Sequence, residues 1–449
     1  MTRTIRIFTV LLAAAAFVSL GSAPVQAQAQ QPQARDLSLA EALTMAAQQN
    51  QQLRIAAFEV AIARSQLAQV RAGTAPQVNA QASYTRTQAQ GPTVVSFGPG
   101  ITVEIPAPSP NLYDVRLVLQ YPLYSGGRIE AQIAFAEANV KGAEAALERV
   151  KQQVIFSVRQ AYYQLLLAQS GLDVADRSVA QAAENLRVAR ARVAAGASPR
   201  FDEVQAEVAV AQARQSQVRS RNAIAQATQG LNALINLPLN TPLRLRDALA
   251  VRPVGPSVDA LIARALEARP EFAELRARQA AAQAGIALAE SGAKPTVAVN
   301  AATSYGNSSA GFVPSTGVSS TWSLTLAATL NLFDGGLTKE RIQEARLRLE
   351  QLRASEAQQH QAVELEVRQA FLNLRSVAEE LAGADAVVTQ AAEALRIANV
   401  RFQSGVGTNL EVLTAQTTAS QAEAGRVQAL FNYNVARATL ERAVGAAVL

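Results

Sequence analysis

The feature that most constrains this chain is an uninterrupted helical pattern from residue 128 to residue 195. The segment contains no proline, and residues that favour or tolerate helix, such as alanine, glutamine, arginine and glutamate, fill most of it. Apolar residues recur three or four positions apart, as at Leu147, Val150 and Val154, and this spacing predicts one helix. Such a helix would be roughly 100 Å long. A compact globular domain needs no helix of this length, whereas a coiled coil or the wall of a long conduit does.

The C-terminal half of the chain repeats this segment and its surroundings. The run Val158-Arg159-Gln160-Ala161-Tyr162 matches Val367-Arg368-Gln369-Ala370-Phe371, and the same gap-free alignment pairs Gly127 with Gly336. Before these glycines, the first copy has extra residues between positions 77 and 126. The sequence therefore predicts a tandem duplication, with a first repeat over 36–240, a linker over 241–256 and a second repeat over 257–445.

Each repeat is predicted to contain two strands, a long helix and a shorter return helix. Strict alternation of apolar and polar residues predicts the strands, at about 76–89, 112–122, 295–305 and 320–332. Helical spacing predicts the long and return helices, at 128–195, 201–236, 337–403 and 410–444. The glycine- and proline-rich residues 90–111 are predicted to form a long hairpin loop. Each return helix is shorter than its long helix and leaves part of it without a neighbour. Predicted helices at 51–72 and 270–291 have the right length to pack along that remaining part.

A pair of glycines joins each strand pair to its long helix. These strand–helix junctions are Gly126, Gly127, Gly335 and Gly336. Glycine permits a tight change from pleated to helical backbone, and Ser125 and Asp334 are predicted N-caps. A phosphate-binding loop is the competing interpretation, but neither glycine pair is followed by the Lys-Ser or Lys-Thr that this motif requires.

The N-terminus predicts export. Arg3 and Arg6 precede an apolar run and the small residues around Ala27, so residues 1–27 are interpreted as a signal peptide cleaved after about Ala27. The chain has no cysteine, which excludes disulfides and thiolate metal sites. The formal charge of +6 falls to +4 without Arg3 and Arg6, and the remaining charges of both signs are scattered along the helices. A nucleic-acid partner needs a clustered basic face, so none is expected.

The predicted strands have the length that tilted strands need to cross a bilayer, about 9–11 residues. Aromatic residues stand near their ends, where aromatic belts form, at Tyr84, Tyr113, Tyr121, Tyr305 and Trp322. Two soluble hairpins with one buried face are the alternative, and periodicity alone does not separate the two. A lipid-exposed strand must have both edges paired, and four strands are too few for a bacterial barrel. The membrane interpretation therefore requires several copies of the chain to close one barrel.

No catalytic constellation, cofactor site or metal site is predicted. His360 is the only histidine, and it stands in a polar stretch of the second long helix without an obvious partner. The sequence contains no Cys–His pair, histidine cluster or nucleophile elbow. The acids accompany arginines at helical spacing, which is typical of solvated or inter-helix ion pairs. We therefore expect no enzyme activity.

The order of these elements, and its double occurrence, resembles the TolC-like outer-membrane efflux proteins (outer membrane factors) over essentially the whole mature chain. The shared features are the duplicated unit, the aromatic-x-Gly-Gly junctions, and two turns in which a glycine stands six residues before an acid. The resemblance implies a mainly α chain with a small β part. Three copies would form a 12-stranded β-barrel in the outer membrane, continued by a helical (α-barrel) tunnel into the periplasm.

The resemblance also implies partners. A homotrimer would dock onto a periplasmic adaptor (membrane fusion) protein and an inner-membrane transporter of RND, ABC or MFS type. Substrates would leave the cell through the duct, as in drug efflux or type I secretion. A soluble periplasmic coiled-coil adaptor or scaffold is the alternative from another class of protein. It would explain the long helices and the signal peptide, but it would not explain the two alternating strand pairs.

In the resembled family, the two turns between long and return helices form the periplasmic tip. By position, the candidate adaptor-docking residues are Gly196, Ala197, Gly405 and Val406. Glu411 and Asp202 are candidate residues of a cation-attracting pore constriction; alternatively, each acid merely opens its return helix, where the helix dipole favours it. The second acid found in some members is Thr414 here. The arginine that latches the closed tip in such members is Gly407, for which Arg200 is a candidate substitute.

Overall fold

The computed structural model describes residues 35–88, 91–96, 98–105, 109–251, 257–307 and 318–445. The predicted signal peptide and part of the predicted linker lie outside these residues. The described helices are α1 Leu39–Gln49, α2 Gln51–Ala72, α3 Arg128–Ala194, α4 Arg200–Leu234, α5 Val258–Ala268, α6 Pro270–Glu290, α7 Leu337–Gln403 and α8 Asn409–Val444. The described strands are β1 Arg35–Leu37, β2 Gln77–Arg86, β3 Thr93–Ser96, β4 Thr102–Ile105, β5 Asn111–Tyr124, β6 Leu243–Leu245, β7 Thr296–Gly306 and β8 Ser319–Thr329.

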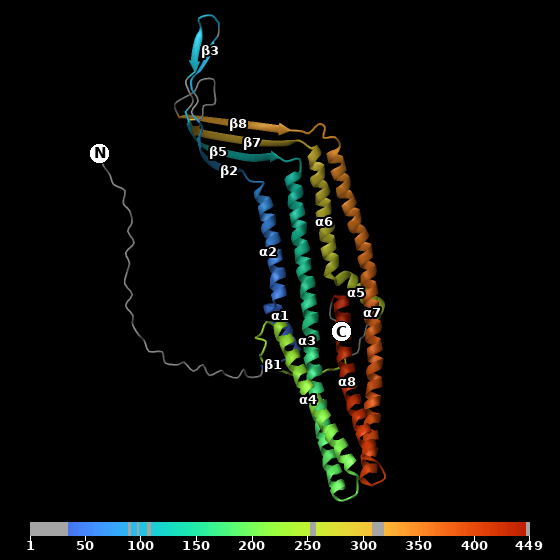
Figure 1. The fold of residues 1–449 in the computed structure, drawn as a ribbon. Helices are drawn as coiled ribbons and strands as arrows, with labels where there is room; N and C mark the ends of the chain where they lie inside the picture. The colour runs from blue at the N-terminus through green and yellow to red at the C-terminus, as the bar shows by residue number, and fades with distance from the viewer. Residues whose placement is uncertain are drawn as a thin grey trace, which may run out of the picture.

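Two long helices form the frame of the molecule. Helices α3 and α7 each have 67 residues, and each folds back through a short turn into its return helix, α4 or α8 (Figure 1). Helix α2 packs along the remaining part of α3, and α6 packs against both α3 and α7. The sequence-based expectation that these two shorter helices complete the long hairpins is therefore confirmed.

The two larger clusters of buried side chains in the described chain are equivalent, one per repeat, and a smaller third cluster near the tip contains Phe402 and Val412. Val158 and Leu231 are buried in the first cluster, and their repeat-mates Val367 and Leu440 are buried in the second. Both clusters lie where a long helix meets its return helix and the short helix α1 or α5. The rest of each rod has few large buried side chains, so the midsection is the main apolar anchor of each repeat.

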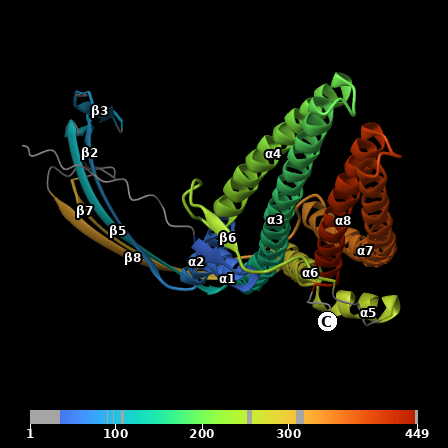
Figure 2. The same cartoon turned by 90° about the horizontal axis from the view of Figure 1, so that it is seen from below.

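One antiparallel sheet joins the two repeats at the end opposite the turns. Its strand order is β2-β5-β7-β8, and every neighbouring pair is antiparallel. Figure 2 shows this sheet as a curved wall that extends away from the helices. The outer edges of β2 and β8 pair with no other strand in the part of the chain that the structure describes.

Two predicted connections contain more structure than the sequence indicated. The loop predicted over 90–111 contains the antiparallel hairpin β3–β4. The linker predicted over 241–256 contains β6, which pairs in parallel with β1 at the start of the described chain. Strands β1 and β6 have only three residues each, which is too short for an alternating pattern to be recognised in a sequence. Their pairing also joins segments that are far apart along the chain.

The predicted caps of the long helices act from a different position than expected. Gly127 and Gly336 are themselves the N-caps, in the left-handed region at φ 86° and 92°. The Ser125 hydroxyl accepts a hydrogen bond from the N–H of Ile129 at 3.1 Å. In the second repeat, the Asp334 carboxylate accepts from the N–H groups of Gly336 and Thr338, at 3.0 and 2.8 Å. The glycine pair curls the backbone so that a side chain two residues before the N-cap reaches the first helical turn.

Candidate functional site

The sheet has one apolar face that the described chain leaves uncovered. The register aligns Val78, Leu119, Ala301 and Leu324 across the four strands. Large side chains on this face are strongly exposed, and Trp322 is 81% exposed. A soluble monomer rarely exposes so extended an apolar patch. This face therefore needs a nonpolar environment, which a lipid bilayer provides.

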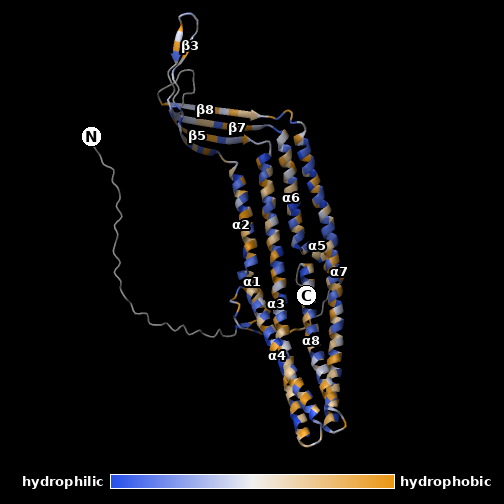
Figure 3. Ribbon diagram, in the orientation of Figure 1, coloured by the Kyte–Doolittle hydropathy of each residue, from blue (hydrophilic) through white to orange (hydrophobic). Residues whose placement is uncertain are grey.

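The opposite face of the same sheet is polar. One row across the strands consists of Gln81, Arg116, Ser304 and Thr321, and the hydroxyl oxygens of Ser304 and Thr321 are 2.7 Å apart. Figure 3 shows polar and apolar residues interspersed along the strands and rods rather than separated into different domains. Such alternation gives a sheet that can contact lipid on one side and water on the other.

Aromatic side chains mark both ends of the apolar face. At the end far from the rods, Tyr84 and Tyr113 are cross-strand partners whose ring centroids lie 5.1 Å apart. Trp322 and Tyr305 belong to the same end, whereas Tyr121 lies near the helices. Amphipathic rings favour the two surfaces of a bilayer. None of the helices in the described part of the chain combines the length and the hydropathy needed to span a membrane.

The tip of the molecule is formed by the two turns that connect long and return helices. Gly196 and Gly405 have positive φ values, 71° and 82°. The next amide in each turn reaches back into the long helix: Ala197 N–H donates to the Arg192 carbonyl at 2.8 Å, and Val406 N–H donates to the Arg401 carbonyl at 3.0 Å. These hydrogen bonds are typical of a helix C-cap in which a glycine adopts the left-handed conformation.

Two of the four tip candidates therefore present their side chains at closely similar positions. Ala197 and Val406 are both exposed, and Val406 is 72% exposed. The two turns lie next to each other at the same end of the molecule (Figure 1).

Glu411 lies in the first turn of α8, where it takes part in helix capping. Its backbone N–H donates to the hydroxyl of the N-cap Thr408 at 3.3 Å. Its carboxylate accepts from Arg401 Nε at 3.4 Å, and both side chains are exposed. Asp202 lies in the first turn of α4, and its carbonyl oxygen accepts from Asn409 Nδ2 at 3.2 Å. The structure thus brings both acids to the tip, with Asp202 joined by its backbone to the start of α8.

A contact between the two hairpins near the tip was missed by the sequence-based reasoning. The Arg192 guanidinium lies over the Phe402 ring, 4.5 Å from its centroid, and also donates to the Phe402 carbonyl. Deeper in the bundle, Asn185 Nδ2 donates to Asn409 Oδ1 at 3.2 Å, and both asparagines are buried. Arg200, the candidate latch, is exposed at the N-terminus of α4, and its role as a latch stays a prediction. Near the tip, Arg192 crosses from the first hairpin to the second.

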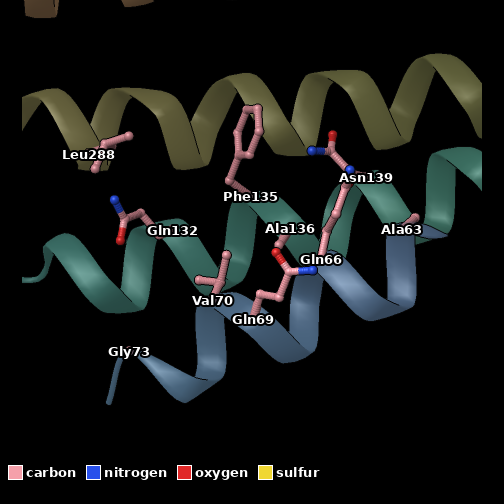
Figure 4. A pocket seen from close by; sticks show the side chains of 10 residues that line it. All are labelled: Ala63, Gln66, Gln69, Val70, Gly73, Gln132, Phe135, Ala136, Asn139 and Leu288. Carbon is pink, nitrogen blue, oxygen red and sulfur yellow. The ribbon is translucent and has the colours of Figure 1, made fainter. Parts of the chain in front are cut away.

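A groove of about 430 Å³ lies between α2, α3 and α6 on the sheet side of the rods. Figure 4 shows Phe135 of α3 reaching toward α6 beside the amides of Gln66, Gln132 and Asn139. None of its lining residues is an acid, a base or a cysteine, so the groove offers shape and hydrogen bonds but no reactive group. His360, for which no partner was predicted, packs on Phe272 with ring centroids 4.7 Å apart.

Comparisons with known proteins agree with this arrangement. A family model described as outer membrane efflux protein matches the chain twice, over residues 42–237 and 261–446. Outer membrane protein OprJ of Pseudomonas aeruginosa is 28% identical over 437 residues, covering 91% of this chain and 84% of OprJ. The solvent efflux pump outer membrane protein SrpC of Pseudomonas putida is 26% identical over 388 residues, covering 85% of this chain and 79% of SrpC. The open-state MtrE outer membrane channel of Neisseria gonorrhoeae has a TM-score of 0.73 at 21% identity, covering 91% of this chain and 89% of that chain.

The fold shared with such structures is that of TolC-like channels, in which three copies form a β-barrel continued by an α-barrel. In a 12-stranded barrel made of three such sheets, the open edge of β2 in one copy would pair with the open edge of β8 in the next. A soluble periplasmic adaptor has no use for such a sheet, and that alternative is rejected. The apolar sheet face, the paired rods and the double family match lead to one conclusion: the chain belongs to the outer membrane efflux protein family.

Proposed function

We propose that this protein is the exit duct of a tripartite pump, in which a periplasmic adaptor joins the helical tip to an inner-membrane transporter. One observation carries the proposal. A single chain continues a lipid-facing sheet directly into rods of 67 residues, so that one molecule spans from the outer membrane deep into the periplasm. Energy for transport comes from the transporter, since the glycine pairs of this chain lack a phosphate-loop signature.

The substrates we propose are small organic compounds. Relatives at 25–26% identity are named for efflux of solvents, toluene and antibiotics. A strain lacking this protein is expected to accumulate such compounds and to become sensitive to them, and the intact gene is expected to restore resistance. Comparison of the secreted proteins of both strains tests the alternative, type I secretion. Loss of one secreted protein with unchanged solvent and antibiotic resistance would overturn the small-molecule assignment.

The adaptor is proposed to dock at Gly196, Ala197, Gly405 and Val406. A photo-crosslinking residue at Ala197 or Val406 is expected to capture a periplasmic membrane fusion protein, identified by mass spectrometry. The matched control is Val387, which is similarly apolar and exposed but lies far from the turn on α7. Capture from Val387 alone, with nothing from either turn, would contradict docking at the tip.

A constriction that attracts cations is proposed at Glu411, with Asp202 as its weaker counterpart. In each copy, the Arg401 guanidinium partly neutralises the Glu411 carboxylate. The two residues are therefore expected to have opposite effects on the cation preference of the channel. Glu411→Ala should lower the cation preference of the reconstituted channel, whereas Arg401→Ala should raise it. Asp202→Ala is the matched comparison, because Asp202 occupies the equivalent position in the first repeat. Reversal potentials in a salt gradient measure the preference, and unchanged values in Glu411→Ala would exclude the ring.

A further inference from the structure

The hairpin β3–β4 is the part of the described chain that the exit-duct function does not explain. It lies in the loop between β2 and β5, where the first repeat is longer than the second, and within the described residues each copy carries one such hairpin. Figure 1 shows it projecting beyond the sheet, on the side away from the rods. Since the rods extend into the periplasm, the hairpin stands on the external rim of the barrel.

The two faces of this hairpin differ in polarity. Val95 is the cross-strand partner of Val103, and both side chains belong to one face. Ile101 precedes the same strand by one residue and is exposed. The other face pairs Val94 with Glu104, and Ser96 with Thr102. The face with Val95 and Val103 is therefore apolar, whereas the face with Glu104 is mostly polar.

An isolated two-stranded hairpin is marginally stable in water, because it has no third element to cover its apolar face. Within the described chain, β3 and β4 pair only with each other. The loop that carries them connects β2 to β5, and β2 is the edge strand that meets the next copy when the barrel closes. Each hairpin is thus placed beside a subunit boundary, and the threefold axis brings two further hairpins to the same rim.

We infer that the three hairpins pack against one another through Val95 and Val103 and narrow the external mouth of the duct. The inference rests on the proposed function for its orientation in the cell. A barrel of 12 tilted strands has a radius of about 12 Å. The six residues from Thr93 to the turn span about 20 Å when extended, which is enough to reach the axis from the rim.

Charge decides which face turns inward. If the polar face pointed to the axis, three Glu104 carboxylates would meet, and like charges in close contact repel one another. With the apolar face inward, Glu104 of each copy points to water, and the three valine pairs share a nonpolar contact. The arrangement covers the apolar face and leaves the charge solvated.

Single cysteines provide the test, because the chain has none of its own. Val103→Cys is expected to form disulfides between copies on mild oxidation of the trimer. Since a disulfide joins two thiols, at most two of the three copies in each trimer can be linked. Val94→Cys is the matched control on the opposite face of the same hairpin, and it is more exposed than Val103, at 63% against 48%. It is expected to remain monomeric on a denaturing gel.

Two outcomes would overturn the inference. Equal crosslinking of both variants would show that the hairpins collide without a preferred face. An absence of crosslinking at Val103→Cys and also at Val95→Cys, in material that native gels show to be trimeric, would show that no copy covers this face. A fluorescent label attached to Val103→Cys would then be quenched by brominated lipid if the face with Val95 and Val103 contacts the membrane instead. These readouts need neither adaptor nor transporter, so they are independent of whether the efflux assays succeed.

Discussion

At the scale of single residues, Tyr162 shows how the two repeats have diverged. Its side chain is fully buried, and its hydroxyl donates to Asp247 Oδ2 at 2.7 Å, with the Leu37 carbonyl at 3.1 Å. The N–H of Leu39 donates to the same Asp247 oxygen at 2.7 Å. The equivalent residue of the second repeat is Phe371, which has no hydroxyl. Tyr162 therefore ties the strand pair β1–β6 to the first rod.

Tyr162→Phe is expected to destabilise the protein by about 1–2 kcal/mol, because Asp247 loses a hydrogen bond. Burial, and then the hydrogen bond to Asp247, raise the pKa of Tyr162 above its ordinary value. Folding thus favours the neutral phenol, and this stabilisation is complete below about pH 10, the pKa of an unfolded tyrosine, and is lost as the pH rises further. Thermal unfolding of the trimer on both sides of that pH measures the effect.

Tyr84→Phe is the control for this prediction. The Tyr84 hydroxyl bonds Asn111 Oδ1 at 2.9 Å, but the side chain is exposed, so its loss should change the stability by at most about 0.5 kcal/mol. The role given to Tyr162 would be wrong if both variants lost the same stability. It would also be wrong if Tyr162→Phe lost stability at alkaline pH as steeply as the unsubstituted protein.

At the scale of elements, the two strand–helix junctions offer a comparison within one molecule. Gly126 and Gly335 are equivalent and have almost the same φ, 66° and 67°. A Cβ at Gly335 would meet no atom of the described chain within 4 Å, whereas a Cβ at Gly126 would lie 3.0 Å from Lys294 Cβ and 3.2 Å from the Pro295 carbonyl oxygen. The first junction is therefore packed against the chain before β7, and the second is open.

Alanine at either junction is expected to cost about 1–2 kcal/mol for the left-handed backbone. Gly126→Ala should cost more than Gly335→Ala, because it adds the clash with Lys294 and Pro295. The thermal midpoints of the two purified variants, measured side by side, test the difference. A larger loss in Gly335→Ala would mean that the packing at the first junction relaxes easily.

The hairpin–hairpin contact at the tip supports a prediction about closure. Arg192→Ala removes the cation–π contact with Phe402, worth about 0.5–2 kcal/mol, and the hydrogen bond to its carbonyl. The two hairpins of each copy should separate more readily, so the single-channel conductance should rise. Arg190→Ala is the control, because its ion pairs with Glu203 and Glu207 stay within the first hairpin. Equal conductance in both variants would argue against Arg192 as a link between the hairpins.

At the scale of the whole molecule, the lipid-facing side of the sheet is open to direct measurement. Trp322 is the only tryptophan, and it lies on the apolar face near the outer end. Its fluorescence in reconstituted trimers should be quenched by brominated acyl chains and little affected by aqueous iodide, since the ring contacts lipid. Moving the indole by one residue, in Thr321→Trp combined with Trp322→Phe, turns it to the polar face and should reverse the two results. Iodide quenching of Trp322 itself would contradict the assignment of faces.

Local patterns in the sequence determined most of the architecture. Side-chain alternation marks the four strands, a three-to-four spacing marks the rods, and glycine or proline marks their ends, because each of these signals depends on residues close together in the chain. Because the chain is duplicated, the sequence alone identifies Gly196 and Gly405 as equivalent residues, and likewise Asp202 and Glu411. The apolar and polar faces of the sheet follow from the same alternation.

The tertiary structure alone decided which of these similar elements meet. Arg192 and Arg401 are equivalent in sequence, yet Arg401 binds Glu411 within its own hairpin, whereas Arg192 crosses to Phe402. The strand order β2-β5-β7-β8, the β1–β6 pair and the bond from Tyr162 to Asp247 join segments that are distant in the chain. A repeated pattern gives both copies the same local preferences, and only packing between the copies makes their environments different.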